Sequence, residues 1–285
     1  MIKAPPQPYL RLKIFVFLAV VSAVAIIGTY MFASYIDTVA QNHNYLTLGF
    51  DHIYILSRRA DEERRRVMAK QMQFQGMMFG FHPLLSSYDI DHPEDYKHFV
   101  GEENWSTVPV NHTLSSEDLA IFRSHMNVID DILRLEFRSA LVLSDRIDME
   151  VDIKQKMRSV IDKLPESWEV LYLGHCSEPE IQRPSRVQHE SVFIAYKPRC
   201  LYSYAVSRQG ALRLKRILDN IWPNPKYPFE QQMVELVHPM YLEAYVIEPP
   251  LITEVRHNDH TLPQNQTQQH RALKKSTLNK MGVLP

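Results

Sequence analysis

The stretch SALVLSDRIDME, residues 139–150, indicates both the fold and the place of a candidate site. Its first part, Ala140–Leu143, is a short apolar run of the kind that forms a buried strand of a parallel sheet. Three charged residues follow this run at once: Asp145, Arg146 and Asp148. Because ligands of open α/β sheets bind just beyond the carboxyl ends of the strands, we expect the chemistry of the protein at this strand end.

Strand-like and helix-like segments alternate along the chain, which predicts an α/β fold with a mostly parallel sheet flanked by helices. The predicted strands occupy residues 52–56, 77–81, 140–143, 169–173, 201–206 and 241–248. The predicted helices occupy residues 61–72, 115–137, 153–163, 207–221 and 229–237. We interpret residues 82–113 and 174–199 as irregular loops.

The composition is that of a globular protein with an ordinary core, because 45% of the residues are hydrophobic and 23% are charged. The length of 285 residues suits one sizeable domain or a domain with appendages. A net charge of −1 gives no reason to expect a nucleic-acid partner. With only 8 glycines, the chain is also a poor candidate for a nucleotide fold that depends on a glycine-rich turn.

An apolar segment near the amino terminus, Ile14–Ile36, contains no Asp, Glu, Lys, Arg or His. Its length of about 23 residues suffices for a tilted helix across a hydrocarbon core of about 30 Å. Lys3, Arg11 and Lys13 precede the segment and Asp37 follows it, so the positive-inside rule places the amino terminus in the cytosol. A cleaved signal peptide is the alternative to this type II, single-pass membrane anchor.

The anchored interpretation places the body of the protein in the lumen of the Golgi or the endoplasmic reticulum. It divides the chain into a cytosolic tail at 1–13, an anchor at 14–36, a stem at 37–50, a globular domain at 51–256 and a polar, disordered tail at 257–285. Glycosylation sequons at Asn104, Asn111 and Asn265 agree with a luminal body, although such triplets also occur by chance.

Cys176 and Cys200 are the only cysteines, and both lie in the proposed luminal body. In an oxidising compartment such a pair is expected to form a disulfide. Closing a loop of about 25 residues would stabilise the fold by roughly 3 kcal/mol. Two buried free thiols are the alternative, and a zinc site with four cysteine ligands is excluded.

Several segments, in one order and spacing, resemble glycosyltransferase family 25 over about residues 50–255. They are HIYILSRRADEERRRVM at 52–68, FRSHMNVIDDIL at 122–133, SALVLSDRIDME at 139–150, WEVLYLGHC at 168–176 and CLYSYAVSRQGALRL at 200–214. That family includes bacterial lipooligosaccharide galactosyltransferases, collagen galactosyltransferases and fungal type II proteins. The resemblance implies a GT-A fold and transfer of a hexose, galactose or glucose, from a UDP-sugar to a hydroxyl of a glycan or protein.

The family carries a Glu-Asp-Asp metal motif at the end of the central strand, where Mn²⁺ or Mg²⁺ would neutralise the diphosphate leaving group. This sequence has Ser144 in place of the Glu and Arg146 in place of the last Asp. The resemblance leaves Asp145, with Asp148 nearby, as candidate metal ligands. A guanidinium beside the ion should weaken its binding.

Two interpretations of this change remain open. In the first, Arg146 itself contacts the diphosphate, since a guanidinium matches phosphate geometry. In the second, catalysis is lost, and the protein is a silent relative that binds glycans or partner enzymes. Asp145 and Asp148 have a structural alternative, because aspartates at strand ends often bond to the local backbone. A single-pass protein whose α/β body has an unrelated use is a third hypothesis.

On the acceptor side, Glu230 stands where the family has the acid of a Pro-x-Asp motif. The resemblance implies that Glu230 and Asp145 are the catalytic residues, with Glu230 as general base for an acceptor hydroxyl or as the group that positions it. The alternative role of Glu230 is that of an acid at a helix start, favoured by the helix dipole.

The resemblance also implies a donor-binding set. Its members are Arg58, Asp61, His125, Asp145 and Arg146. Arg58 and Asp61 begin the first predicted helix, where donors often approach, whereas Arg64–Arg66 are expected on a solvated helix face. His125 occupies the place of the family's Ser-His pair, and a core histidine is its alternative role.

Overall fold

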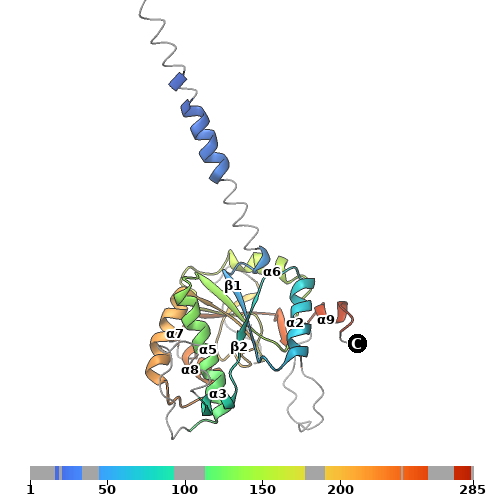
Figure 1. Cartoon of the computed structure of the whole chain (residues 1–285), viewed down its shortest axis with the longest axis vertical. Helices are drawn as coiled ribbons and strands as arrows, with labels where there is room; N and C mark the ends of the chain where they lie inside the picture. The colour runs from blue at the N-terminus through green and yellow to red at the C-terminus, as the bar shows by residue number, and fades with distance from the viewer. Residues whose placement is uncertain are drawn as a thin grey trace, which may run out of the picture. The chain divides into compact units, whose positions relative to one another are not determined.

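The computed structural model describes residues 17–18, 21–33, 45–92, 113–176, 190–238, 240–255 and 273–283. They belong to two units, residues 1–44 and 45–285. In the first unit, residues 21–33 form a helix with exposed side chains (Figure 1). No helix in the described ranges is long and apolar enough to cross a membrane. The predicted anchor at 14–36 lies partly outside the described residues.

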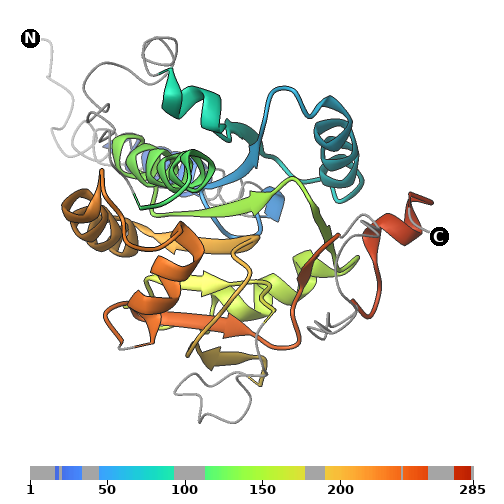
Figure 2. The same ribbon diagram turned by 90° about the horizontal axis from the view of Figure 1, so that it is seen from below.

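A seven-stranded sheet organises the second unit, with the strand order β2-β1-β3-β7-β5-β8-β6 (Figure 2). The strands are β1 (His52–Ser57), β2 (Gly80–Pro83), β3 (Ser139–Ser144), β5 (Val170–Tyr172), β6 (Val192–Ile194), β7 (Ser203–Ser207) and β8 (Ala244–Ile247). β1, β2, β3, β5 and β8 run in one direction, and β6 and β7 run in the other. The prediction of a mostly parallel sheet flanked by helices is confirmed.

Helices cover both faces of the sheet. One face packs against α3 (Ser87–Asp91), α5 (Ser116–Arg134), α7 (Arg208–Ile221) and α8 (Phe229–Val237). The other face packs against α2 (Glu62–Phe74) and α6 (Ile153–Ile161). The helix at α5 begins where its sequence indicated, because the Ser115 side chain accepts a hydrogen bond from the Asp118 amide.

The central strand β3 shows why its sequence is apolar without interruption. Ala140 and Val142 point into the core beneath α5 and α7, whereas Leu141 and Leu143 point into the core beneath α2 and α6. All four side chains are almost completely buried. A strand with helices on both sides has no face for polar residues, so the polar residues of β3, Ser139 and Ser144, stand at its two ends and the charged residues follow it.

The structure contains elements that the sequence did not predict. β6 lies within the predicted loop at 174–199, and α3 lies within the predicted loop at 82–113. β4 (Ile147–Met149) and β9 (Ile252–Glu254) form a separate two-stranded antiparallel sheet. Strands of this length are too short to show the alternation by which strands are recognised.

The predicted stem at 37–50 differs from the structure at its carboxyl end. Leu48 and Phe50 are buried in the core, and Phe50 makes an edge-to-face contact with Trp168 at a centroid distance of 6.5 Å. The globular unit therefore begins earlier than predicted, at Tyr45.

The predicted disordered tail at 257–285 also differs, because residues 273–283 are ordered against the body. α9 (Thr277–Lys280) contacts β4, and Leu278 is buried. Asp148 accepts hydrogen bonds from the Leu278 amide at 3.1 Å and from the Ser276 hydroxyl. Glu150 accepts from the amides of Lys274 and Lys275, at 2.6 and 3.1 Å. Charged groups after β3 thus anchor a distant segment.

This anchor yields a testable prediction. Replacing Asp148 by Asn puts an amide NH₂ among groups that are themselves donors, so the free energy of unfolding should fall by about 1–3 kcal/mol in urea titrations. The control is Asp162→Asn, at an exposed position after α6, which should change stability little. Equal losses in both variants would contradict the assigned role of Asp148.

Candidate functional site

A pocket of about 250 Å³ lies at the carboxyl ends of the adjacent parallel strands β1 and β3. Its apolar lining includes Leu56, Leu84, Ile121 and Leu201, and its polar lining includes His125, Ser144, Glu230 and Glu254. This is the strand end at which the sequence predicted the chemistry of the protein. Helix α5 contributes His125, and the first turn of α8 contributes Glu230.

The predicted site residues fall into two groups. Glu230 and His125 line the pocket directly. Arg58 and Asp145 instead lie just beyond it, since Leu56 pairs with Ser144 across the two strands and the chain leaves the sheet soon after both residues. Asp61 lies next to this second group through its ion pair with Arg64.

Asp145 is held by groups of the protein itself. The Ser57 hydroxyl donates a hydrogen bond to Asp145 Oδ2 at 2.7 Å, and Arg64 Nε lies 3.5 Å from the same oxygen. The side chain of Asp145 is only 5% exposed. The expectation that Arg64 belongs to a solvated helix face is wrong, because its side chain is 24% exposed and contacts both Asp145 and Asp61. The spacing of Asp61 and Arg64 on one helix was the signal available in the sequence.

Three guanidinium groups gather at this edge of the pocket. Burial lowers the pKa of Arg64, and the positive charges of Arg146 and Arg58 lower it further, while Asp145 opposes them. Arg58 forms an ion pair with Glu117. Arg146 is exposed, and within the described part of the chain its side chain makes no ion pair. Arg146 is thus a cation available to an anionic ligand.

The carboxylates at the strand end do not fit a divalent cation. Mn²⁺ and Mg²⁺ need several oxygen ligands, mostly from carboxylates and water. Asp145 is engaged by Ser57 and Arg64, and Asp148 by Gln71, Met149, Ser276 and Leu278. Among the described residues, no group of three His, Cys, Asp or Glu is placed to hold a metal ion. Asp148 is 5% exposed and enclosed by these donors, so its metal role stays a prediction that its contacts do not favour.

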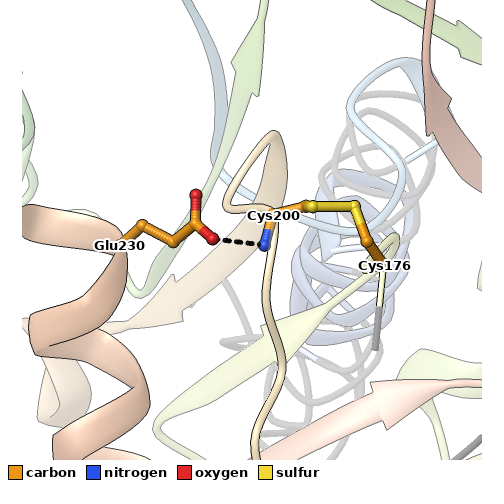
Figure 3. Close-up of a disulfide and its surroundings, with 3 residues drawn as sticks. All are labelled: Cys176, Cys200 and Glu230. Carbon is orange, nitrogen blue, oxygen red and sulfur yellow. Dashed lines mark hydrogen bonds between the residues drawn. A yellow bond between two sulfur atoms is a disulfide. The ribbon is translucent and has the colours of Figure 1, made fainter. Parts of the chain in front are cut away.

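Glu230 is positioned through a disulfide, as Figure 3 shows. Its Oε1 accepts a hydrogen bond from the Cys200 amide at 2.8 Å, and Cys200 is bonded to Cys176 with a Cα–Cα distance of 5.5 Å. The backbone of Cys200 has a positive φ of 64°, so the amide is held in an uncommon turn. Glu230 also contributes to the raised pKa of buried Tyr172, for which burial is the main cause.

His125 is a neutral group at the pocket wall. Its Nδ1 lies 2.7 Å from the Tyr204 hydroxyl, and its ring stacks on Phe229 at 4.3 Å. Burial, with a smaller contribution from His82, lowers its pKa to about 3. His125 therefore fills the core position that its helix pattern indicated and also borders the pocket.

Glu254 is a pocket residue that sequence reasoning missed. It belongs to the short strand β9, whose partner β4 follows Arg146 directly. Burial, followed by the charges of Glu254 and Glu248, raises the pKa of Tyr202 in the pocket lining. No motif marks Glu254 in the sequence, because only the pairing of β9 with β4 brings it to the site.

Comparisons with known proteins place the chain among relatives of glycosyltransferases. A family described as "Glycosyltransferase family 25 (LPS biosynthesis protein)" matches residues 50–225. The chain belongs to this family, which confirms the resemblance found in the sequence.

Curated relatives agree with this assignment. Procollagen galactosyltransferase 2 of Mus musculus is 24% identical over 184 residues, covering 59% of this chain and 28% of the relative. Procollagen galactosyltransferase 1 of Danio rerio is 26% identical over 155 residues, covering 49% and 25%. A glycosyltransferase 25 family member of Aedes aegypti is 22% identical over 187 residues, covering 63% and 30%. The matches therefore span less than a third of the length of these relatives.

Among solved structures, the apo form of mouse xyloside xylosyltransferase 1 matches with 13% sequence identity and a TM-score of 0.29, covering 70% of each chain. A TM-score of this size carries no argument about the fold or the site.

The disulfide gives a prediction for stability. Replacing both Cys176 and Cys200 by Ser should lower the free energy of unfolding by roughly 3 kcal/mol, because the unfolded chain regains the freedom of the closed loop. Urea titrations of the variant and of the oxidised protein measure this loss. Reduction of the unmodified protein should produce the same change, and an unchanged midpoint in either case would refute it.

The buried imidazole gives a prediction for pH. The pKa of His125 is about 3 in the folded protein and 6.5 when unperturbed, so its contribution is complete above pH 6.5 and declines as the pH falls. Below pH 6.5 the unfolded chain binds the proton first, which costs about 1.4 kcal/mol per pH unit. In His125→Gln the free energy of unfolding should therefore fall less steeply between pH 6.5 and 5.

The matched control for this measurement is His92→Gln, at an exposed position. It should keep the pH slope of the unmodified protein. Identical slopes in the His125 variant and the unmodified protein would show that His125 takes up protons normally in the folded state.

Proposed function

We propose that the protein is a glycosyltransferase that moves a hexose, galactose or glucose, from a UDP-sugar to a hydroxyl of a glycan or protein. Membership of family 25 supports the reaction class. The observation that carries the proposal is a pocket with the Glu230 carboxylate in its wall and a cluster of guanidiniums beyond its strand-end edge. These are the two kinds of group that hexosyl transfer needs, a base for the acceptor and positive charge for the leaving diphosphate.

The chemistry follows from this arrangement. In an inverting displacement the acceptor oxygen forms a bond with C1 of the hexose while the bond from C1 to the diphosphate oxygen breaks. Glu230 takes the proton of the acceptor hydroxyl. UDP leaves with the electron pair of the broken bond, and its developing charge is stabilised by the guanidinium of Arg146.

The remaining predicted donor residues support these groups. Asp145 acts through its contact with Arg64, and Asp61 forms the second ion pair of that arginine. The ion pair with Glu117 fixes the orientation of the Arg58 side chain. His125, neutral and stacked on Phe229, forms a wall against which the donor packs.

We further propose a luminal location, in the Golgi or the endoplasmic reticulum, with type II attachment to the membrane. The Cys176–Cys200 disulfide supports an oxidising compartment. Lys3, Arg11 and Lys13 before the apolar segment support a cytosolic amino terminus. The sequons at Asn104, Asn111 and Asn265 agree with this location, and all lie outside the described residues.

A catalytically silent relative that binds glycans or partner proteins is the second candidate. The observation in its favour is that Asp145, which alone keeps its place in the family's metal motif, contacts Ser57 and Arg64. Thermal unfolding with UDP-galactose and UDP-glucose separates the two candidates, since a ligand that binds the folded state must raise the midpoint. A silent relative should show no rise with either sugar and no transfer to any acceptor.

The role of Glu230 gives a direct test. Glu230→Gln keeps an oxygen that can accept from the Cys200 amide but cannot take a proton at neutral pH. Its kcat for transfer should fall by about 10²–10⁴-fold with little change in thermal stability. The control is Glu235→Gln, on the exposed side of the same helix, which should keep full activity. Unchanged turnover in the Glu230 variant would exclude it as the base.

A further inference from the structure

The loop after β3 offers no free carboxylate to a metal ion. Asp145 is engaged by the Ser57 hydroxyl at 2.7 Å and by Arg64 at 3.5 Å. The next acid, Asp148, is turned toward α2 and α9, where it accepts hydrogen bonds from Gln71 and Leu278, and it is 5% exposed. No acid of this loop is left to bind a cation.

Positive charge occupies the same place. The exposed Arg146 directly follows Asp145, and Arg64 approaches Asp145 from α2. The charges of Arg146 and Arg58 both act on the pKa of Arg64, so the three guanidiniums lie within electrostatic reach of one another. Ser144, one residue before Asp145, lines the pocket. The cluster therefore borders the cavity at the end of β3.

We propose that this protein binds the diphosphate of a nucleotide donor without a divalent cation, and that Arg146 and Arg64 supply the charge that a metal would supply. Arg146 binds the phosphate oxygens directly, since it makes no ion pair in the described part of the chain. Arg64 acts as the second cation and is oriented by Asp145 and Asp61. This inference rests on the proposed function, because it concerns the donor of that reaction.

The physical basis is the match between guanidinium and phosphate. The planar fork of an arginine donates two parallel hydrogen bonds to a pair of phosphate oxygens, and its charge does not depend on pH. A fixed arginine therefore neutralises a diphosphate whether or not a metal ion is in solution. Because the cluster is partly exposed, its attraction for the diphosphate should weaken as ionic strength rises.

The experiment measures binding of UDP to the full chain by calorimetry, with EDTA in one series and Mn²⁺ in the other. Inorganic pyrophosphate serves as a second probe that lacks the nucleoside. We expect UDP to bind in EDTA with the affinity found in Mn²⁺, and both probes to bind more weakly at high salt. Arg146→Gln should raise the Kd for UDP about tenfold or more.

Matched variants show whether the arginines act as ligands. Arg64→Gln should also weaken binding, and Arg64→Lys, which keeps the charge but not the fork, should restore part of it. Arg66→Gln is the control, since Arg66 is exposed on the same helix and pairs with Glu63. Thermal unfolding of each variant shows whether it is folded. If Arg64→Gln does not fold, the test rests on Arg146→Gln, because Arg146 is exposed and its replacement should leave the fold intact.

Each outcome decides the proposal. UDP binding that requires Mn²⁺, that is absent in both buffers, or that is unaffected by Arg146→Gln would overturn it. Failure of the proposed function is distinguishable from these results. UDP binding in EDTA without any hexosyl transfer would refute the transferase but not the metal-free site, whereas transfer that depends on Mn²⁺ would refute only the metal-free site.

Discussion

The complete burial of β3 between two layers of helices is the constraint on which the rest of this protein depends. A strand without a solvent-facing side cannot carry polar groups along its length, so these groups collect where the strand leaves the sheet. β1 runs parallel to β3 and ends at the same level, since Leu56 pairs with Ser144. The polar residues after both strands are therefore brought to one edge of the sheet, and the pocket forms there.

At that edge, carboxylates and guanidiniums pair with one another. An aspartate near several arginines gains more from an ion pair and a hydroxyl donor than it would gain from exposure to water. Asp145 forms such an ion pair with Arg64 and accepts a hydrogen bond from the Ser57 hydroxyl. Asp148 has instead become the acceptor that fastens α9 to the body. Both aspartates thus make structural contacts, while Arg146 is exposed.

The main architecture was readable from the sequence because it rests on local patterns. The apolar run of β3, the amphipathic face of α5 and the cap at Ser115 are each contained in a few consecutive residues. Other contacts join residues about a hundred or more positions apart, so no local sequence pattern indicates them. They are the pairing of β4 with β9 and the contact of α9 with Asp148. Glu254 was missed as a site residue for the same reason, since its neighbours come from other elements. Arg64 was missed although its spacing from Asp61 indicated their ion pair, because its second partner, Asp145, follows β3. Glu230 and His125 were found through the family resemblance.

The contact between the Cys200 amide and Glu230 makes the placement of one acid depend on a covalent event elsewhere in the chain. A newly made chain whose two sulfurs are still reduced has the helix that bears Glu230 but lacks the tether that fixes its hydrogen-bond donor. The arginines after β1 and β3 have no such dependence. The two sides of the pocket therefore form at different stages: the cationic side is complete once the sheet has formed, and the acidic side is complete only after the Cys176–Cys200 disulfide has formed.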